Sequence, residues 1–142
     1  MRLLAEECRY VEVEALVERG LGEGAYYVSI YSPSFERALG FKPYPGTLNA
    51  RVYGASSSLR DCLDSGGHVL VEPPVGSRGL KPVLVYRAEL VGEPRARVYL
   101  VKPLASKHGD DVIELISNTY LREALGLRDG DVVRVRVYCE WC

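Results

Sequence analysis

Short segments in which hydrophobic and polar residues alternate recur along this chain, and glycine, proline or aspartate separates them. The clearest covers residues 10–18, where valines and an alanine alternate with glutamates, as in a half-buried strand. Residues 132–138 alternate valine with arginine after an Asp-Gly-Asp turn. A series of short strands of this kind predicts a small β-barrel.

The remaining segments complete a mainly β fold with short helices. Further strands are predicted at residues 25–31, 47–53, 67–71, 83–91, 96–101 and 112–117. One short helix is predicted from Ser32-Pro33 to a stop at Gly40, and a second from a Thr119 cap to Gly126. Residues 54–66 and 73–80 have loop composition. A length of 142 residues with 47% hydrophobic content fits one compact domain.

Charge and hydropathy narrow the classes of partner. The 18 basic residues nearly cancel the 19 acidic ones, so no global field steers the protein onto nucleic acid or a membrane. A small-molecule partner is therefore favoured. Apolar runs are far too short to span a bilayer, and Glu6 and Glu7 interrupt the N-terminal apolar stretch, which argues against a secretory signal. We expect a cytoplasmic protein.

Four cysteines raise the question of disulfides or a metal site. Cys8, Cys62, Cys139 and Cys142 could form two disulfides, but nothing else places the chain in an oxidising compartment, so we predict mostly reduced thiols. Cys139 and Cys142 have C-x-x-C spacing, yet a zinc site needs a second pair and a redox motif needs a strand followed by a helix start. Incidental or disulfide-forming thiols are the favoured interpretation of this tail.

The segment Gly20–Gly24 has three glycines at alternate positions. Without a Cβ, its backbone can adopt left-handed conformations and approach a ligand closely, and its amides could surround a phosphate. A plain hairpin turn explains the same residues equally well. Because we expect a strand to follow, the dinucleotide-binding fingerprint, which needs a following helix, is not met.

Thr47 and Asn49 lie two residues apart on a predicted strand, so a hydroxyl and an amide oxygen share one face. Neutral oxygen ligands suit a Mg²⁺ ion that takes its other ligands from water and substrate phosphates. The alternative is that both residues merely end the turn at Pro45-Gly46, and residues of these types are common there. The pattern alone favours the turn.

Two ionisable residues are further candidates. Glu114 stands between Ile113 and Leu115, so its carboxylate is partly desolvated if it faces inward, which would suit a base. A solvent-facing acid on a half-exposed strand is at least as good an explanation. Arg122, in the second predicted helix, could contact a phosphate, although a surface role is more common for arginine.

The order of these motifs is specific even though each is weak alone. The chain has Gly-Leu-Gly-Glu-Gly-Ala-Tyr-Tyr at 20–27, Leu-Gly-Phe-Lys-Pro-Tyr-Pro-Gly-Thr-Leu-Asn at 39–49, Ile-Glu-Leu-Ile at 113–116 and Leu121-Arg122. From about Val11 to Tyr138 it closely resembles the archaeal CTP-dependent riboflavin kinases. The resemblance implies a small six-stranded Greek-key barrel of the cradle-loop type, with residues 1–142 as a single riboflavin kinase-like domain.

The resemblance also implies an activity and a set of site residues. The expected enzyme transfers the γ-phosphate of CTP to the 5′-hydroxyl of riboflavin, giving FMN and CDP, with Mg²⁺ as cofactor. Apart from the resemblance, we expect a monomer without nucleic acid or membrane partners. The nucleotide-binding residues would be Gly20, Leu21, Gly22, Glu23, Gly24, Ala25, Thr119, Tyr120, Leu121 and Arg122. Ser106 and Glu114 would contact the flavin, and Thr47 and Asn49 would bind the metal. Its apolar neighbours make Glu114 our candidate for the catalytic base.

One departure and two alternatives accompany this resemblance. Where the family usually has Arg-Thr-x-His-Gly, this chain has Ala105-Ser106-Lys107-His108-Gly109, so the hydroxyl is kept but the arginine is not. The run Leu-Gly-Leu-Arg-Asp-Gly-Asp at 125–131 also resembles a hairpin of swapped-hairpin transcription regulators, but the near-zero net charge argues against DNA binding. The second alternative is a barrel that binds flavin or nucleotide without catalysis. Such a protein would lack the metal pair, but Thr47 and Asn49 are both present here.

Overall fold

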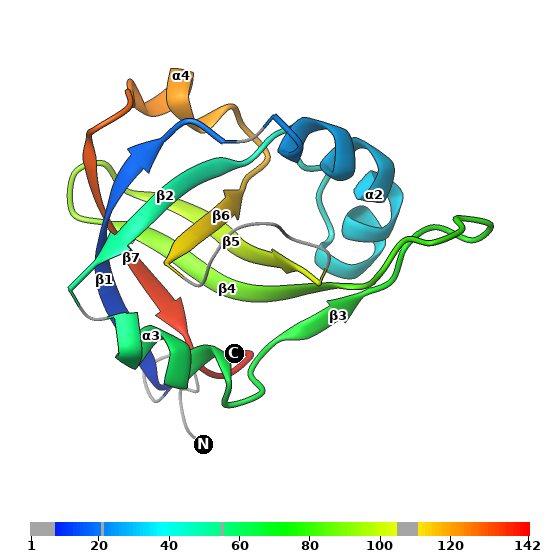
Figure 1. Cartoon of the computed structure of the whole chain (residues 1–142), viewed down its shortest axis with the longest axis horizontal. Helices are drawn as coiled ribbons and strands as arrows, with labels where there is room; N and C mark the ends of the chain where they lie inside the picture. The colour runs from blue at the N-terminus through cyan, green and yellow to red at the C-terminus, as the bar shows by residue number, and fades with distance from the viewer. Residues whose placement is uncertain (1–7, 21, 55, 105–110) are drawn as a thin grey trace.

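The computed structural model describes residues 8–20, 22–54, 56–104 and 111–142. Figure 1 shows strands curled into a barrel, with helices packed outside it. The elements are β1 (Tyr10–Glu18), α2 (Gly24–Leu39), β2 (Leu48–Tyr53), α3 (Ser56–Leu63), β3 (Val69–Val71), β4 (Val83–Val91), β5 (Ala96–Pro103), β6 (Val112–Ile116), α4 (Leu121–Leu125) and β7 (Val132–Tyr138). In the described part of the chain, no helix is long and apolar enough to cross a membrane.

The strands form a closed antiparallel barrel. Neighbours follow the order β4-β5-β6-β2-β1-β7, and a further pairing of β4 with β7 closes the ring. The short β3 pairs with the first residues of β4. Every second residue of a strand points inward, as Val13, Ala15 and Val17 of β1 do, and these side chains fill the barrel core. The prediction of a mainly β, six-stranded barrel is confirmed.

A second, smaller core lies outside the barrel wall. Val28, Tyr31 and Phe35 of α2 pack against outward-facing residues of β3, β4, β5 and β6, which are Val71, Val83, Val85, Val101 and Ile116. Figure 1 shows α2 covering this part of the wall, with α3 at the opposite end of the barrel. The outer face of β6, which would otherwise meet water, is therefore buried.

The strand predicted at 25–31 is wrong, because these residues belong to α2. Val28, Tyr31 and Phe35 are spaced by three and four residues, which puts them on one helical face, and all three are buried. The same residues also satisfy a short alternating pattern, so local periodicity did not separate the two structures. Packing on the barrel wall favours the helix, which continues through Pro33. The helix ends at Gly40, which has the left-handed conformation, as predicted.

The loop predicted at 54–66 is also wrong in its middle, where α3 forms. Leu59, Cys62 and Leu63 are spaced as one helical face and are buried in the barrel core. The serines at its start gave the segment loop composition. The other predicted strands are confirmed with small shifts at their ends, and the second helix forms with Tyr120 instead of Thr119 at its N-cap.

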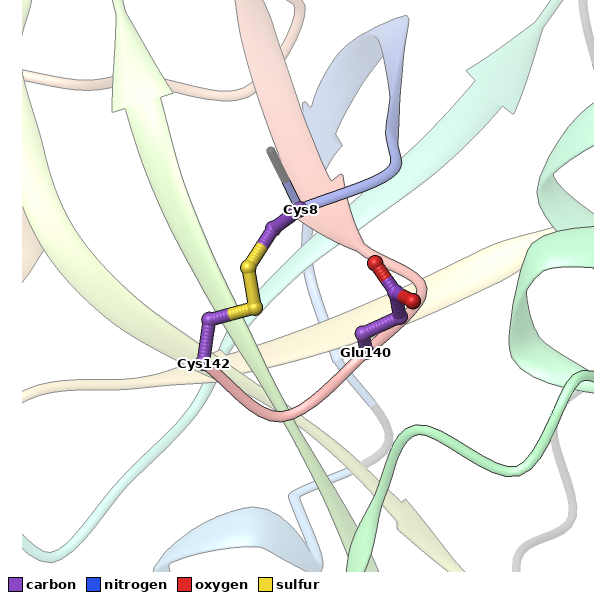
Figure 2. A group of neighbouring side chains, drawn as sticks. All are labelled: Cys8, Glu140 and Cys142. Atoms are coloured by element: carbon purple, nitrogen blue, oxygen red, sulfur yellow. A yellow bond between two sulfur atoms is a disulfide. The ribbon is translucent and has the colours of Figure 1, made fainter. Parts of the chain in front are cut away.

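The cysteines are paired, which corrects the prediction of mostly reduced thiols. Cys8 is bonded to Cys142 and Cys62 to Cys139, so the two cysteines of the C-x-x-C motif have different, distant partners. The ligating atoms of Cys8, Glu140 and Cys142 lie within 4.8 Å of one another (Figure 2). Because both sulfurs belong to a disulfide, this group lacks the thiolates that a metal site would need.

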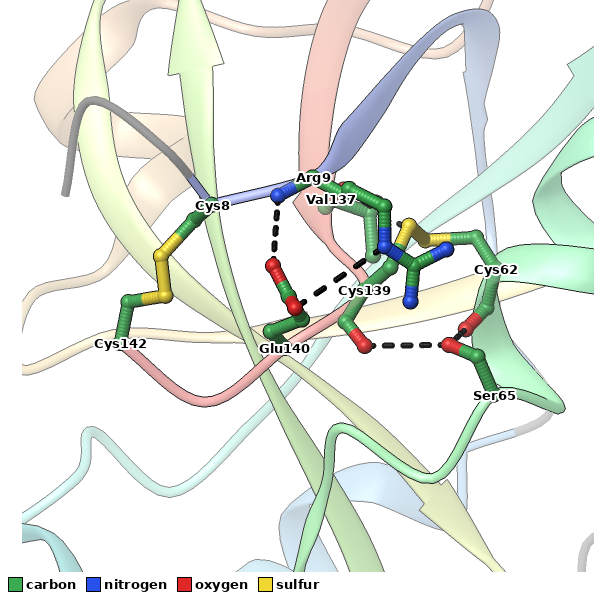
Figure 3. Close-up of polar contacts among 8 residues, drawn as sticks. All are labelled: Cys8, Arg9, Cys62, Ser65, Val137, Cys139, Glu140 and Cys142. Carbon is green, nitrogen blue, oxygen red and sulfur yellow. Dashed lines mark hydrogen bonds and ion pairs between the residues drawn. A yellow bond between two sulfur atoms is a disulfide. The ribbon is translucent and has the colours of Figure 1, made fainter. Parts of the chain in front are cut away.

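Hydrogen bonds reinforce the two bridges (Figure 3). The Ser65 hydroxyl contacts the carbonyl oxygens of Cys62 at 2.6 Å and Cys139 at 3.0 Å. The Arg9 amide donates to the Glu140 carboxylate at 2.8 Å, and the Cys139 amide donates to the Arg9 carbonyl at 2.9 Å. The segment before β1, the end of α3 and the tail after β7 are thus joined at one end of the barrel.

Removal of the bridge between Cys62 and Cys139 is expected to lower stability without unfolding the barrel. The bridge closes a long loop, with a sequence separation of 77, and such links stabilise by about 2–4 kcal/mol, largely by restricting the unfolded chain. A Cys62→Ala/Cys139→Ala variant should lose that amount in guanidinium unfolding without reductant. Wild-type protein that unfolds at the same midpoint with and without reductant would contradict this prediction.

Candidate functional site

A cavity of about 730 Å³ opens where the end of β1, the start of α2 and the start of β2 meet. This volume is in the range of small-molecule sites. The cavity is lined by Arg19, Gly20, Gly22, Glu23, Gly24, Ala25, Tyr26, Tyr27, Tyr31, Gly46, Thr47, Asn49, Gly79, Leu80, Lys81, Val83, Pro103 and Glu114. The predicted glycine segment, metal pair and acid therefore share one cavity.

Strand pairing places the two most buried polar residues of this cavity opposite each other. Asn49 of β2 is the register partner of Glu114 of β6. Their neighbours along each strand fill the barrel core, so both side chains point outward, beneath the cover that α2 and the glycine segment provide. Asn49 is only 5% exposed and Glu114 only 7%. Glu114 thus faces neither the barrel interior nor solvent, the two orientations considered from sequence.

Side-chain oxygens of Thr47, Asn49 and Glu114 lie close together in this cavity. The Thr47 hydroxyl donates to Asn49 Oδ1 at 2.8 Å, and Thr47 Oγ1 lies 3.4 Å from Glu114 Oε1. A hydroxyl has one proton, so it cannot donate fully to both acceptors at once. Hard oxygen donors in a small cluster are the ligands that Mg²⁺ prefers, and the residues present therefore fit such an ion.

The glycines permit this close packing. A Cβ on Gly24 would collide with the Thr47 hydroxyl, and a Cβ on Gly20 would lie 3.0 Å from the Asn49 side chain. Gly22 has a φ of 82°, a left-handed conformation that side chains disfavour. The glycine segment therefore lies directly against the oxygen cluster, with no side chain between them. Leu21 lies outside the described residues.

A helix N-terminus also faces this cavity. α2 begins at Gly24, Glu23 occupies its N-cap without a capping side-chain hydrogen bond, and the first turn contains no acidic residue. The first amides of a helix have no partners within it and attract anions. The strand predicted after the glycines is wrong, and the helix that replaces it gives this segment the feature of phosphate-binding loops that sequence reasoning found missing.

The predicted segment Thr119–Arg122 lines a second, smaller cavity of about 30 Å³, which shares Gly46 and Thr47 with the first. The rings of Tyr44 and Tyr120 are stacked there, with centroids 4.8 Å apart. Arg122 is held in place by the Glu18 carbonyl at 3.1 Å and the Asp129 carboxylate at 2.6 Å. A volume of this size suits a water molecule, so a nucleoside would have to displace the tyrosine rings.

Sequence reasoning gave no role to the three tyrosines of α2 that line the cavity, Tyr26, Tyr27 and Tyr31, of which the last two are the more buried. The Tyr27 hydroxyl is buried and makes no well-formed hydrogen bond with any described residue. Burial raises the pKa of Tyr27 well above its usual value, and the negative charge of Glu114 and a side-chain hydrogen-bonding contact with it add to this effect. Tyr31 donates its hydroxyl to the Lys81 carbonyl, and burial raises its pKa as well. The i,i+4 spacing of Tyr27 and Tyr31 would have shown the shared face, had the helix been predicted.

Ser106, the other predicted flavin contact, lies outside the described residues. So do Ala105 and the rest of the Lys-His-Gly-Asp segment up to residue 110. Among the described residues, the structure therefore brings together the glycine segment, the metal pair and Glu114, and places Thr119–Arg122 in the adjoining cavity.

The fold and the cavity define a β-barrel protein with a site for small molecules, in which backbone amides and oxygen side chains converge. Comparison with known proteins gives the family. The family model CTP-dep_RFKase, described as domain of unknown function DUF120, matches residues 17–137. The chain belongs to this family of CTP-dependent riboflavin kinases, and it is an enzyme.

Curated archaeal relatives agree with this assignment. A riboflavin kinase of Aeropyrum pernix is 42% identical over 87% of this chain and 93% of its own length. A riboflavin kinase of Staphylothermus marinus is 35% identical over 92% of this chain and 94% of its own. One from Pyrobaculum islandicum is 42% identical over 92% of this chain, which spans 62% of that longer relative. Family membership supports the phosphorylation of riboflavin to FMN.

Gly24→Ala is expected to destabilise the protein, because the added methyl group would overlap the Thr47 hydroxyl. Overpacking of this kind typically costs about 1–3 kcal/mol. The measurement is the free energy of unfolding in guanidinium. A Gly24→Ala/Thr47→Ala double variant should recover part of the loss, since it removes the hydroxyl that clashes. Equal stabilities of wild type and Gly24→Ala would contradict the described packing.

Proposed function

We propose that this enzyme transfers the γ-phosphate of CTP to the 5′-hydroxyl of riboflavin, giving FMN and CDP. The observation that carries the proposal is the convergence, in one cavity, of the glycine segment and α2 N-terminus with the Thr47, Asn49 and Glu114 oxygens. Phosphoryl transfer requires mainly that the reacting groups be positioned and that charge on the transferred group be offset. This cavity offers both kinds of group.

The phosphates of the nucleotide would lie along the glycine segment. Residues 22–25, which include the start of α2, line the cavity, and the free amides of a helix N-terminus attract negative charge. Thr119–Arg122 would contact the nucleoside, with the adjoining small cavity enlarged by movement of the Tyr44 and Tyr120 rings. The choice of CTP over other nucleotides is supported by the family alone.

Thr47 and Asn49 would hold the divalent ion, which we propose to be Mg²⁺. Both ligands are neutral, so the bound ion would keep its full charge to offset the charge on the phosphates. The 2.8 Å hydrogen bond between the two side chains keeps their oxygens together in the described structure. Glu114, 3.4 Å from Thr47, is close enough to contribute a carboxylate to the same cluster.

Glu114 would contact the ribityl end of riboflavin and act as the base. As the bond from the 5′-oxygen to the γ-phosphorus forms and the bond from the γ-phosphorus to the bridging oxygen of CDP breaks, the hydroxyl proton would pass to the Glu114 carboxylate. Its burial beside Thr47 puts it next to the proposed metal.

A contact of Ser106 with the flavin stays a prediction. The same holds for a single domain over residues 1–142, a cytoplasmic location, a monomeric state and the absence of nucleic acid and membrane partners.

Incubation with riboflavin, Mg²⁺ and one nucleoside triphosphate at a time tests the reaction directly. We expect FMN with CTP and much slower formation with ATP, GTP or UTP, detected by chromatography of the fluorescent flavins. FMN formed equally well with ATP would contradict the proposed donor. A complete lack of FMN with every nucleotide would contradict the proposed function.

Thr47→Ala and Asn49→Ala are each expected to weaken the response to Mg²⁺. Loss of one oxygen ligand should raise the Mg²⁺ concentration for half-maximal activity by at least about tenfold, a loss that even outer-shell ligands produce. Ser58→Ala is the matched control, because it removes an exposed hydroxyl on α3 at the other end of the barrel. An unaltered Mg²⁺ titration in both site variants would refute the metal assignment.

A further inference from the structure

Tyr27 is a polar residue of the cavity wall to which no role has so far been given. It lies in the first turns of α2 and lines the cavity that Glu114 also lines. Its ring makes an edge contact with Tyr31, at a centroid distance of 6.3 Å and an interplanar angle of 80°. The ring therefore packs against its own helix, and its hydroxyl oxygen is buried.

The Tyr27 hydroxyl is in an unusual position for a buried polar group. It is inaccessible to water and makes no well-formed hydrogen bond with any described residue. Buried hydroxyls nearly always have a partner, because leaving one unsatisfied is costly. By contrast, the buried hydroxyl of Tyr86 donates to the Leu63 carbonyl at 3.1 Å. A buried donor without a well-formed hydrogen bond in a ligand cavity indicates a hydrogen bond that forms when ligand is bound.

Glu114 is the acceptor that the surroundings offer. It is the buried acid among the described residues of the cavity wall, and both its charge and a side-chain hydrogen-bonding contact with its carboxylate raise the pKa of Tyr27. This contact does not have the geometry of a full hydrogen bond in the described structure. A carboxylate has two oxygens and can accept several hydrogen bonds, so a contact of Oε1 with Thr47 leaves capacity for another donor. A tyrosine phenol is protonated at ordinary pH, and burial raises the pKa of Tyr27 further, so its hydroxyl stays a donor.

We propose that Tyr27 is a positioning residue that donates its hydroxyl hydrogen to the Glu114 carboxylate when riboflavin occupies the cavity. The hydrogen bond would hold one carboxylate oxygen and so direct the other toward the ribityl hydroxyl that is to be phosphorylated. This inference rests on the proposed function, because it concerns how Glu114 meets the flavin. Tyr27 would not touch the reacting atoms itself.

The test is a double-mutant cycle on kcat with Tyr27→Phe and Glu114→Gln. A hydrogen bond to a charged group is strong, so Tyr27→Phe should lower kcat about 10- to 100-fold in the wild-type background. In the Glu114→Gln background the same change should alter kcat less than about twofold, because Tyr27 acts through the lost carboxylate. KM for CTP should stay within about twofold, since Tyr27 is assigned no nucleotide contact.

Unfolding measurements separate positioning from a structural role. Tyr27→Phe removes a hydroxyl that makes no well-formed hydrogen bond, so the melting temperature should stay the same or rise. Tyr86→Phe is the matched control, since it removes a buried hydroxyl that has a partner in the barrel core, away from the cavity. It should lower the melting temperature and leave kcat unchanged.

Three outcomes would overturn the proposal about Tyr27. They are an unchanged kcat in Tyr27→Phe, an equal loss in both backgrounds, and a fall in melting temperature that matches the Tyr86→Phe control. In each of these cases wild-type protein still converts riboflavin to FMN, so the proposed function stands. Wild-type protein that makes no FMN with any nucleoside triphosphate overturns the proposed function, and the role of Tyr27 with it.

Discussion

The antiparallel pairing of β2 with both β1 and β6 is the constraint on which the site depends. This register sets Asn49 opposite Glu114 on one side and Glu18 on the other. Because side chains alternate between the faces of a strand, a slip of one residue would send Asn49 and Glu114 into the barrel core and bring Leu48 and Leu115 out. The hydrophobic core therefore fixes the position of the oxygen cluster, since only one register buries the apolar side chains.

The second requirement is a cover over the outer barrel wall. On a bare barrel, Asn49 and Glu114 would face water, where Mg²⁺ ligands are hydrated and a carboxylate is screened. α2 buries Val28, Tyr31 and Phe35 against the wall and brings the glycine segment onto Thr47 and Asn49. The same packing that stabilises the helix thus encloses the polar cluster and aims a helix N-terminus at it.

The disulfides and the candidate site lie at different ends of the barrel. β1 begins beside Cys8, at the disulfide-linked end, and finishes at Glu18, next to Asn49 and Arg122. A nine-residue strand is about 30 Å long, so the bridges hold the chain far from the cavity. The disulfides can restrict the unfolded chain without constraining the movements that ligand binding in the cavity requires.

The sequence by itself determined the barrel, because strands such as 10–18 and 132–138 alternate so regularly that only one face of each can be buried. It also supplied Gly20–Gly24, Thr47, Asn49 and Glu114 as candidates, because their residue types suit phosphate, metal or proton chemistry. Only the tertiary structure decided that residues 25–31 are helical, since their apolar spacing fits a strand or a helix until the barrel wall selects one face. It likewise decided the burial of Glu114, the pairing of the cysteines and the place of Tyr27, because each depends on contacts between residues far apart in the chain.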